Sequence, residues 1–207
     1  VTRVPTILDF LPIVPTTQNA FKFMQEVLLE SPAAGRLEGQ PSGEATVEYE
    51  EQTVPIRRIG VTLPVTEEQL EDEPGVRALV EQRMATLLRV ALDAEAVAGD
   101  GLDGSLRGLL SLTGTQTQAK GSDPIIDAFA KAMTKVRTTG GASPNLILMN
   151  PNDHLKLILT RTTDGAYVMG HPSDEMSRRL LGVSIALSET LPAGTALVLD
   201  TNYFPLV

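Results

Sequence analysis

The sequence contains no cysteine and no tryptophan, and aromatic residues make up only 4% of its 207 positions. Without cysteine these residues cannot form a disulfide, a thiolate nucleophile or a zinc ribbon. The lack of cysteine suits a reducing compartment. Because large aromatic side chains are so few, the hydrophobic core must consist mainly of leucine, valine, isoleucine and alanine.

Basic residues are also scarce: 17 Lys and Arg stand against 26 Asp and Glu, which gives a formal net charge of −9. A protein that grips a phosphate backbone needs a basic face, so this balance argues against tight nucleic-acid binding. No apolar stretch reaches the roughly 18 residues of a membrane span. The apolar N-terminus is interrupted by three prolines and by Asp9, which excludes a signal peptide. The remaining composition is ordinary for one large or two modest folded domains.

Residues 1–35 are expected to form an extended N-terminal arm that leads into a first strand. Residues 36–65 are rich in β-branched and charged residues and have no continuous apolar face. That pattern is typical of a long two-stranded β-ribbon. A ribbon of this kind is marginal alone in water, so it must lie on another surface.

From Pro74 the apolar period changes to that of an α-helix, which we expect to run to about Ala98. Its apolar residues fall on one stripe: Val76, Leu79, Val80, Met84, Leu87, Leu88 and Ala91. Two i,i+4 ion pairs are expected on the other side of this helix, Arg77 with Glu81 and Arg89 with Asp93.

Residues 121–200 alternate between helical and strand patterns. A second helix begins at Asp123-Pro124 and ends at Gly140-Gly141, and a third is capped by Asn150-Pro151. The segment "NLILMN" between them is expected to be a short buried strand, and two further strands flank the turn at 192–194. The sequence therefore predicts an α+β or α/β unit over residues 121–200, within a protein of the α+β class.

The stretch "GDGLDG", residues 99–104, matches the spacing of a dinucleotide-binding fingerprint. In that fingerprint the glycines follow a strand and open a helix, whereas here they follow the long helix. We therefore interpret the stretch as a helix C-terminus with Gly99 in the left-handed conformation, followed by a turn. Asp100 and Asp103 also lack the spacing of a calcium loop.

No catalytic constellation is visible. The two histidines, His154 and His171, have no serine elbow to work with, and His154 is expected to be a surface or packing residue. The carboxylate runs are interpreted as solvated faces, and the pairs Arg57-Arg58 and Arg178-Arg179 as salt-bridge partners within or between chains. The protein is not expected to be an enzyme or to need a cofactor or metal.

Five stretches, in this order, resemble the major capsid protein of tailed bacteriophages, whose shell fold is shared with encapsulin nanocompartments. They are "DFLPIVPT", "VEYEEQTVPIRRIGVTLPVTEEQLED", "ALDAEAVAGDGLDGSLRGLL", "LILMNPNDHLKLILTRTTDGAYVMG" and "LLGVSIALSETLPAGTALVLD". Together they cover most of residues 6–200.

The resemblance implies a domain organisation: an N-terminal arm (1–35), an extended β-ribbon loop (36–65), a peripheral domain (66–120) with spine helix 74–98, an axial domain (121–200), and the start of a return to the peripheral domain (201–207). Members of the family continue beyond this point, so we expect the chain to be trimmed at its C-terminal end. Val1 is either a maturation cleavage product or a trimmed boundary.

The resemblance also implies a function. It predicts a self-assembling icosahedral capsid subunit that encloses DNA, forms hexamers and pentamers, and assembles in the host bacterial cytoplasm with scaffold, maturation protease and portal. The residues expected to contact adjacent subunits are Glu48, Tyr49, Glu50, Glu51, Arg57 and Arg58. An encapsulin-like shell is the alternative, and a nucleotide-binding enzyme is a remote one.

Some members of the family cross-link their subunits through a lysine of the extended loop. No lysine lies between Arg36 and Thr62, so isopeptide chemistry from that loop is not expected.

Overall fold

The computed structural model describes residues 6–30, 35, 43–64, 74–162, 164–169 and 179–206, the side chains of 28–30 and 74 excepted. The chain divides into two compact units. We call Val14–Ile56 the ribbon unit, and Val1–Ile13 together with Arg57–Leu206 the body.

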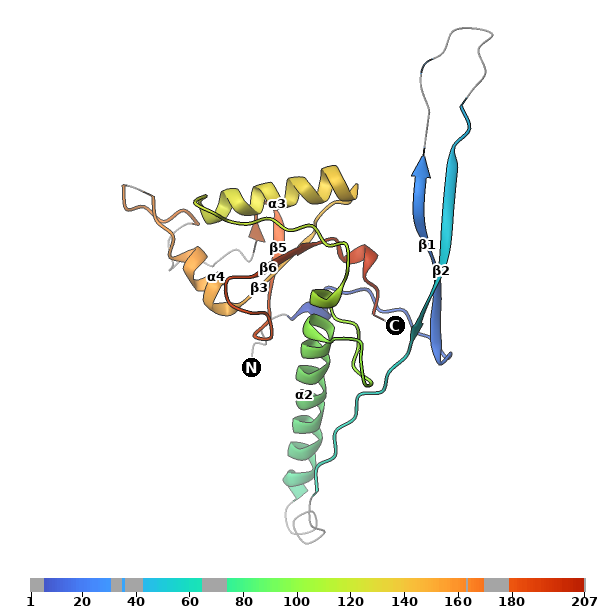
Figure 1. Cartoon of the computed structure of the whole chain (residues 1–207). Coiled ribbons are helices and arrows are strands. Elements are labelled where there is room, and N and C mark those ends of the chain that lie inside the picture. Colours follow the sequence, from blue (N-terminus) through green and yellow to red (C-terminus); the bar gives the residue numbers. More distant parts are fainter. Residues whose placement is uncertain are drawn as a thin grey trace. The chain divides into compact units, whose positions relative to one another are not determined.

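The ribbon unit consists of two antiparallel strands, β1 (Ala20–Glu30) and β2 (Thr46–Pro55) (Figure 1). Their pairing runs from Ala20 opposite Pro55 to Glu30 opposite Thr46, with a β-bulge at Val27. The expected ribbon is present, but it begins before the range 36–65. The strand that the sequence placed in the arm is its first half, because "FKFMQEV" pairs with the acidic strand.

The body contains a four-stranded sheet in the order β4-β5-β3-β6. These strands are β3 (Leu146–Met149), β4 (Arg179–Leu180), β5 (Val183–Leu187) and β6 (Ala196–Leu199). β3 pairs in parallel with β5 and antiparallel with β6. The two strands expected around the 192–194 turn are therefore present, but they flank β3 rather than pairing with each other.

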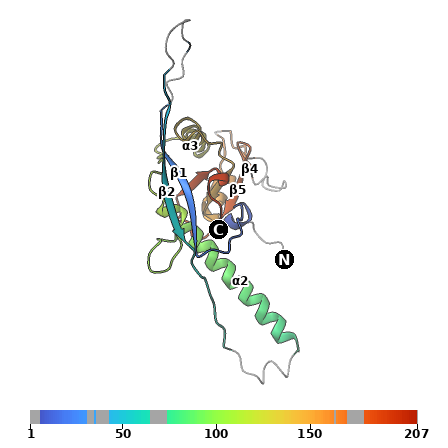
Figure 2. The same ribbon diagram turned by 90° about the vertical axis from the view of Figure 1, so that its right-hand side faces the viewer.

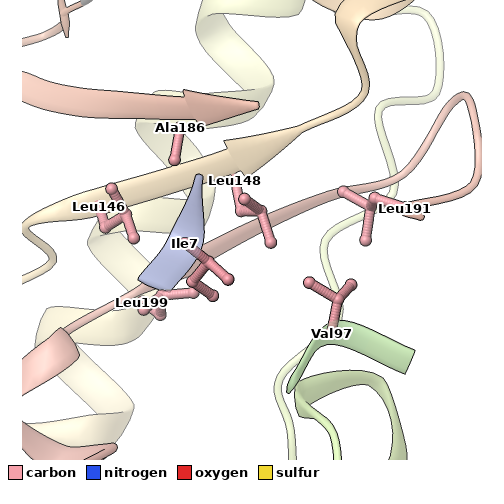
Figure 3. Close-up of a cluster of buried hydrophobic side chains, with 7 residues drawn as sticks. All are labelled: Ile7, Val97, Leu146, Leu148, Ala186, Leu191 and Leu199. Carbon is pink, nitrogen blue, oxygen red and sulfur yellow. The ribbon is translucent and has the colours of Figure 1, made fainter. Parts of the chain in front are cut away.

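Alternation along β3 divides the core into two layers, because successive side chains of a strand point to opposite faces. Ile147 and Met149 pack with the helices α3 (Ile125–Gly140) and α4 (Pro151–Ile158). Leu146 and Leu148 pack on the other face. Figure 3 shows the second layer, in which the seven buried side chains are Ile7, Val97, Leu146, Leu148, Ala186, Leu191 and Leu199.

The expected helix over 74–98 is α2 (Pro74–Ala98), a straight rod whose C-terminal end meets the rest of the body (Figure 2). Only its last turns enter the core, where Val97 is fully buried. Along the predicted apolar stripe, four residues are half-buried, whereas Leu79 is 67% exposed and Leu87 is 38% exposed; the half-buried residues are Val76, Val80, Met84 and Leu88. No described side chain in the first half of the helix is fully buried.

Local chemistry fixes the ends of the other helices. α3 ends at Gly141, whose φ of 61° is the left-handed conformation that glycine tolerates best. α4 begins at Asn150, whose side chain accepts a hydrogen bond from Asn152 N–H at 3.0 Å. Three short 3-10 turns complete the body: η1 (Ile7–Asp9), η2 (Leu109–Ser111) and η3 (Thr201–Tyr203).

Candidate subunit-contact surfaces

Four of the six residues expected to make subunit contacts lie consecutively on β2. Glu48, Tyr49, Glu50 and Glu51 are all exposed, and Tyr49 retains 63% of its accessible surface. Tyrosine is among the residues that contribute most often to the binding energy of protein interfaces.

The strand register divides these four residues between the two faces of the ribbon. Tyr49 stands opposite Glu26 and Glu51 opposite Met24, whereas Glu50 stands opposite Gln25. Residues directly opposite each other share a face, and the next pair lies on the other face. One cation is close by: Lys22 Nζ lies 2.6 Å from Glu51 Oε1. The exposed position of both groups limits the net stabilisation from this pair to about 1 kcal/mol or less.

Arg57 and Arg58 follow the end of β2 and belong to the body rather than to the ribbon unit. Both side chains are exposed, and neither forms an ion pair with another described residue. The structure therefore brings the four β2 residues together and leaves the two arginines outside that group. Arg178 and His171 lie outside the described residues.

The "GDGLDG" loop folds back on the C-terminal end of α2. Gly108 N–H donates to Gly99 O at 2.9 Å, and Gly101 N–H donates to Leu106 O at 3.0 Å. Asp100 and Arg107 form an isolated antiparallel bridge. Gly99 itself lies buried at the helix end, and the left-handed glycines are Gly101 and Gly104, so the expected left-handed residue comes two positions later than predicted.

This geometry opposes nucleotide binding. The N–H groups of Leu102, Ser105 and Leu106 are already bonded, to the Asp100 carboxylate, the Leu102 carbonyl and the Glu95 carboxylate. The loop also lies at the negative end of the α2 dipole, which repels phosphate. The loop is a packed helix terminus.

The loop after α2 does not form a ligand cluster for calcium or another metal ion. The Asp100 carboxylate accepts the Leu102 N–H at 2.9 Å, which makes it part of a turn. Among the described residues no three His, Cys, Asp or Glu side chains converge as a metal site would require. Within the same residues, no helix has both the length and the apolar composition needed to cross a bilayer.

A polar cluster that the sequence did not reveal joins the turn η1 to α2. Arg89 Nη2 lies 2.5 Å from Asp9 Oδ1, and Asp9 Oδ2 accepts the Thr6 N–H at 3.0 Å. The predicted Arg89–Asp93 ion pair is therefore wrong, because Arg89 reaches across to the N-terminal turn. The Arg77–Glu81 pair is confirmed, at 3.2 Å.

Asp93 is instead buried, with 8% of its surface exposed. Ser188 Oγ, which follows β5, donates to Asp93 Oδ2 at 3.2 Å. Burial raises the pKa of this carboxyl above its ordinary value, and the Ser188 hydrogen bond opposes the rise. Asp93 thus links α2 to the segment after β5, beneath a turn whose Ile7 is fully buried.

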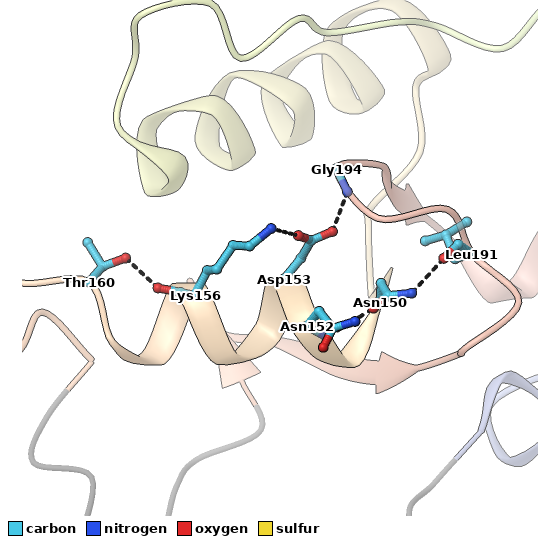
Figure 4. A network of polar contacts seen from close by, with 7 residues as sticks. All are labelled: Asn150, Asn152, Asp153, Lys156, Thr160, Leu191 and Gly194. Carbon is cyan, nitrogen blue, oxygen red and sulfur yellow. Dashed lines mark hydrogen bonds and ion pairs between the residues drawn. The ribbon is translucent and has the colours of Figure 1, made fainter.

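A second network links α4 to the loop before β6 (Figure 4). Asn150 Nδ2 donates to Leu191 O at 2.8 Å, and Gly194 N–H donates to the Asp153 carboxylate. Lys156 Nζ lies 2.8 Å from the same carboxylate. The Lys156 ammonium and then the Gly194 N–H hold the pKa of Asp153 below its ordinary value. Asp153 thus ties the loop before β6 to α4, and the half-buried His154 follows it on the same helix.

An open cavity of about 350 Å³ lies between α3, α4 and β6. Its floor is apolar, with Phe129, Met149 and Val198 among its residues, and Lys120 and Lys156 stand among its polar lining.

The sequence profile of the Phage capsid family matches residues 1–206. Among curated proteins, the "Major capsid protein" of Enterobacteria phage HK97 is 25% identical over 193 residues. The match covers 92% of this chain and 50% of that protein, so the chain spans half the length of the curated relative.

Solved structures with similar folds include one described as "Capsid of native GTA particle computed with C5 symmetry" (TM-score 0.68, 17% identity, 90% of this chain and 68% of that chain). Another is that of Mycobacterium phage Bobi (TM-score 0.68, 16% identity, 97% and 71%). At such identities these likenesses show the fold alone. The predicted α+β fold with its long helix and β-ribbon is thereby confirmed.

Proposed function

The chain belongs to the phage capsid family, and from that premise we propose that it is a structural subunit of an icosahedral virion shell. It acts through contacts with copies of itself rather than through catalysis. The observation that carries the proposal is the family match over 1–206, since the curated relative within it is a major capsid protein. The role of the whole protein is part of the proposal, because the chain spans only half the length of that relative.

Two features of the chain support a role in assembly. The ribbon has two strands and no core of its own, and such ribbons need a partner surface. In the first half of α2 no described side chain is fully buried, and Leu79 is 67% exposed. A subunit that completes its packing only among neighbours would have both.

We further assign roles to the segments. The ribbon, with the expected loop 36–65, reaches onto an adjacent subunit. Helix 74–98 is the spine of a peripheral domain (66–120), and residues 121–200 form an axial domain that meets its copies in hexamers and pentamers. Glu48, Tyr49, Glu50, Glu51, Arg57 and Arg58 make contacts between subunits.

The shell encloses DNA, and its net charge of −9 suits a wall that must not grip its contents. Its site of action is the virion, after assembly in the host bacterial cytoplasm. Scaffold, maturation protease and portal are its expected partners.

The expectation about covalent cross-links needs a narrower form. Residues 36–62 contain no lysine, but the ribbon does contain Lys22 on β1, paired with Glu51. Isopeptide chemistry is therefore not expected from β2 or the segment before it, and this expectation does not extend to β1.

Electron microscopy of the full-length protein, produced alone and together with its neighbouring genes, tests the proposal. Closed shells tens of nanometres across are expected. Small uniform shells that exclude DNA and hold an enzyme would favour an encapsulin-like compartment. A protein that stays monomeric or dimeric under both conditions would refute the shell role.

Charge reversal tests the contribution of the two arginines. The double variant Arg57→Glu/Arg58→Glu should assemble poorly while its circular dichroism stays that of the parent, because the two charges act between chains. The control is Arg57→Lys/Arg58→Lys, which keeps both charges. If the reversed variant assembles as the control does, these residues are not subunit contacts.

A further inference from the structure

The two faces of the ribbon differ chemically in the part where Met24 to Glu26 of β1 pair with Tyr49 to Glu51 of β2. One face carries Met24, Tyr49 and Val47, which are 64%, 63% and 40% exposed. Glu26 and Glu51 border these side chains on the same face. The other face at the same level carries Gln25, Glu48 and Glu50, with Leu28 of β1 opposite Glu48.

The difference follows from strand geometry. On β2 the residues 47, 49 and 51 share one face, and 48 and 50 share the other, because the side-chain period of a strand is two. Across the ribbon, Glu26 stands opposite Tyr49 and Met24 opposite Glu51. The sequence run "VEYEE" is thus split into an apolar-acidic face and a purely acidic one.

At the other end of the ribbon, next to Asn19, the apolar side chains lie on the opposite face. There the face of Gln25 carries Phe21, Phe23 and Val54, and the two phenylalanine rings stack with centroids 6.1 Å apart. The face of Tyr49 carries Lys22 and Thr53 at that level. The apolar cluster of Met24, Tyr49 and Val47 is therefore separate from the phenylalanine cluster.

We propose that the face bearing Met24, Tyr49 and Val47, which we call the docking face, binds a second copy of this chain. The opposite face, with Gln25, Glu48 and Glu50, remains in solvent. Of the four β2 residues assigned to subunit contacts, Tyr49 and Glu51 make the contact and Glu48 and Glu50 do not. This inference rests on the proposed shell function.

Charge and size indicate the occupant. Glu51 on the docking face is paired with Lys22, whereas Glu26 has no ion pair among the described residues, so the acceptor presents a cation beside an apolar surface. A second copy offers exposed arginines without an ion pair among the described residues, Arg57 and Arg58 included. From Val47 to Glu51 the patch spans only about 13 Å of strand. That is too small for a stable two-chain complex, and it suits one of many repeated contacts in an assembly of copies.

Site-directed thiols test the assignment, because these 207 residues contain no cysteine. Met24→Cys and Gln25→Cys are adjacent positions on opposite faces. Thiol labelling rates are compared between assembled particles and dissociated subunits of the full-length protein, with the parent as background. Assembly should slow labelling at position 24 by about tenfold or more and leave position 25 within about twofold, since a buried thiol reacts only when its contact opens.

Two substitutions to the same residue give an independent test. Tyr49→Gln should raise the protein concentration needed for assembly by about tenfold, as loss of an aromatic anchor does, while Glu50→Gln should leave it unchanged. Circular dichroism of the unassembled variants controls for folding.

The outcomes separate the inference from the function on which it rests. Four outcomes would overturn the face assignment and leave the shell function standing. In the labelling test they are equal protection at positions 24 and 25, protection at 25 alone, and loss of assembly in both cysteine variants. In the assembly test it is an equal defect in Tyr49→Gln and Glu50→Gln. A parent protein that forms no particles under any condition would refute the shell function, and the docking face would fall with it.

Discussion

Replacement of Gly108 by alanine tests how the loop after α2 packs. A Cβ at this position would lie 2.5 Å from Gly99 N, 2.8 Å from Glu95 O and 2.9 Å from Ala98 N. All three atoms belong to the backbone, so no side-chain rotation can relieve the clash. The φ of Gly108 is −76°, which alanine adopts readily. The effect of the substitution is therefore steric.

Overpacking typically costs about 1–3 kcal/mol, and a clash with fixed backbone belongs at the upper end of that range. Gly108→Ala should lower the free energy of unfolding by about 3 kcal/mol. The control is Gly140→Ala at the end of α3, where a Cβ would meet nothing within 4 Å. There alanine should stabilise by up to about 1 kcal/mol through helix propensity.

Urea unfolding of the unassembled protein, followed by circular dichroism, measures both changes. The two variants should differ by about 3–4 kcal/mol with little change in the denaturant slope. A difference below about 0.5 kcal/mol would mean that the loop does not lie against the helix end. The assignment of "GDGLDG" as a packed terminus would then be wrong.

Two further predictions concern the N-terminal turn and α2. Ile7→Ala removes a fully buried side chain and should lower the free energy of unfolding by about 2–5 kcal/mol. The control Ile13→Ala, at a residue 72% exposed, should change it by less than about 0.5 kcal/mol. Equal effects would place Ile7 outside the core. Because burial raises the pKa of Asp93, the folded state binds this proton more tightly than the unfolded chain, and stability is lost as pH rises through the folded-state pKa. Asp93→Asn should therefore raise the melting temperature near pH 7 and leave it nearly unchanged below the ordinary carboxyl pKa of 3.8. A variant that melts lower than the parent at neutral pH would contradict that burial cost.

The helices could be predicted from the sequence because their signals are local. Pro74 opens α2, Asn150-Pro151 opens α4, and Gly141 closes α3, and each acts within one helical turn. The buried strand β3 was readable for a similar reason, since four consecutive apolar residues require cover on both faces.

The partners of polar side chains could not be predicted in the same way. The i,i+4 rule pairs Arg89 with Asp93, but it describes an isolated helix. In the fold Asp9, 80 residues away, lies closer to the guanidinium, and Ser188 reaches the buried Asp93. A contact that depends on which segment packs against the helix leaves no mark in the helix's own sequence.

The ribbon combines both situations. Composition identifies the acidic strand, and the strand period separates Tyr49 from Glu50. The pairing with β1 adds that Tyr49 shares its face with Met24. Because the side-chain period of a strand is two, four consecutive residues cannot all face one partner. If the ribbon lies on a single surface of a neighbouring subunit, then half of the acidic run must face away from that surface. The negative charges of the run then have two roles. Those on the docking face take part in specific contact, and those on the other face keep the ribbon from aggregating with others through its edges.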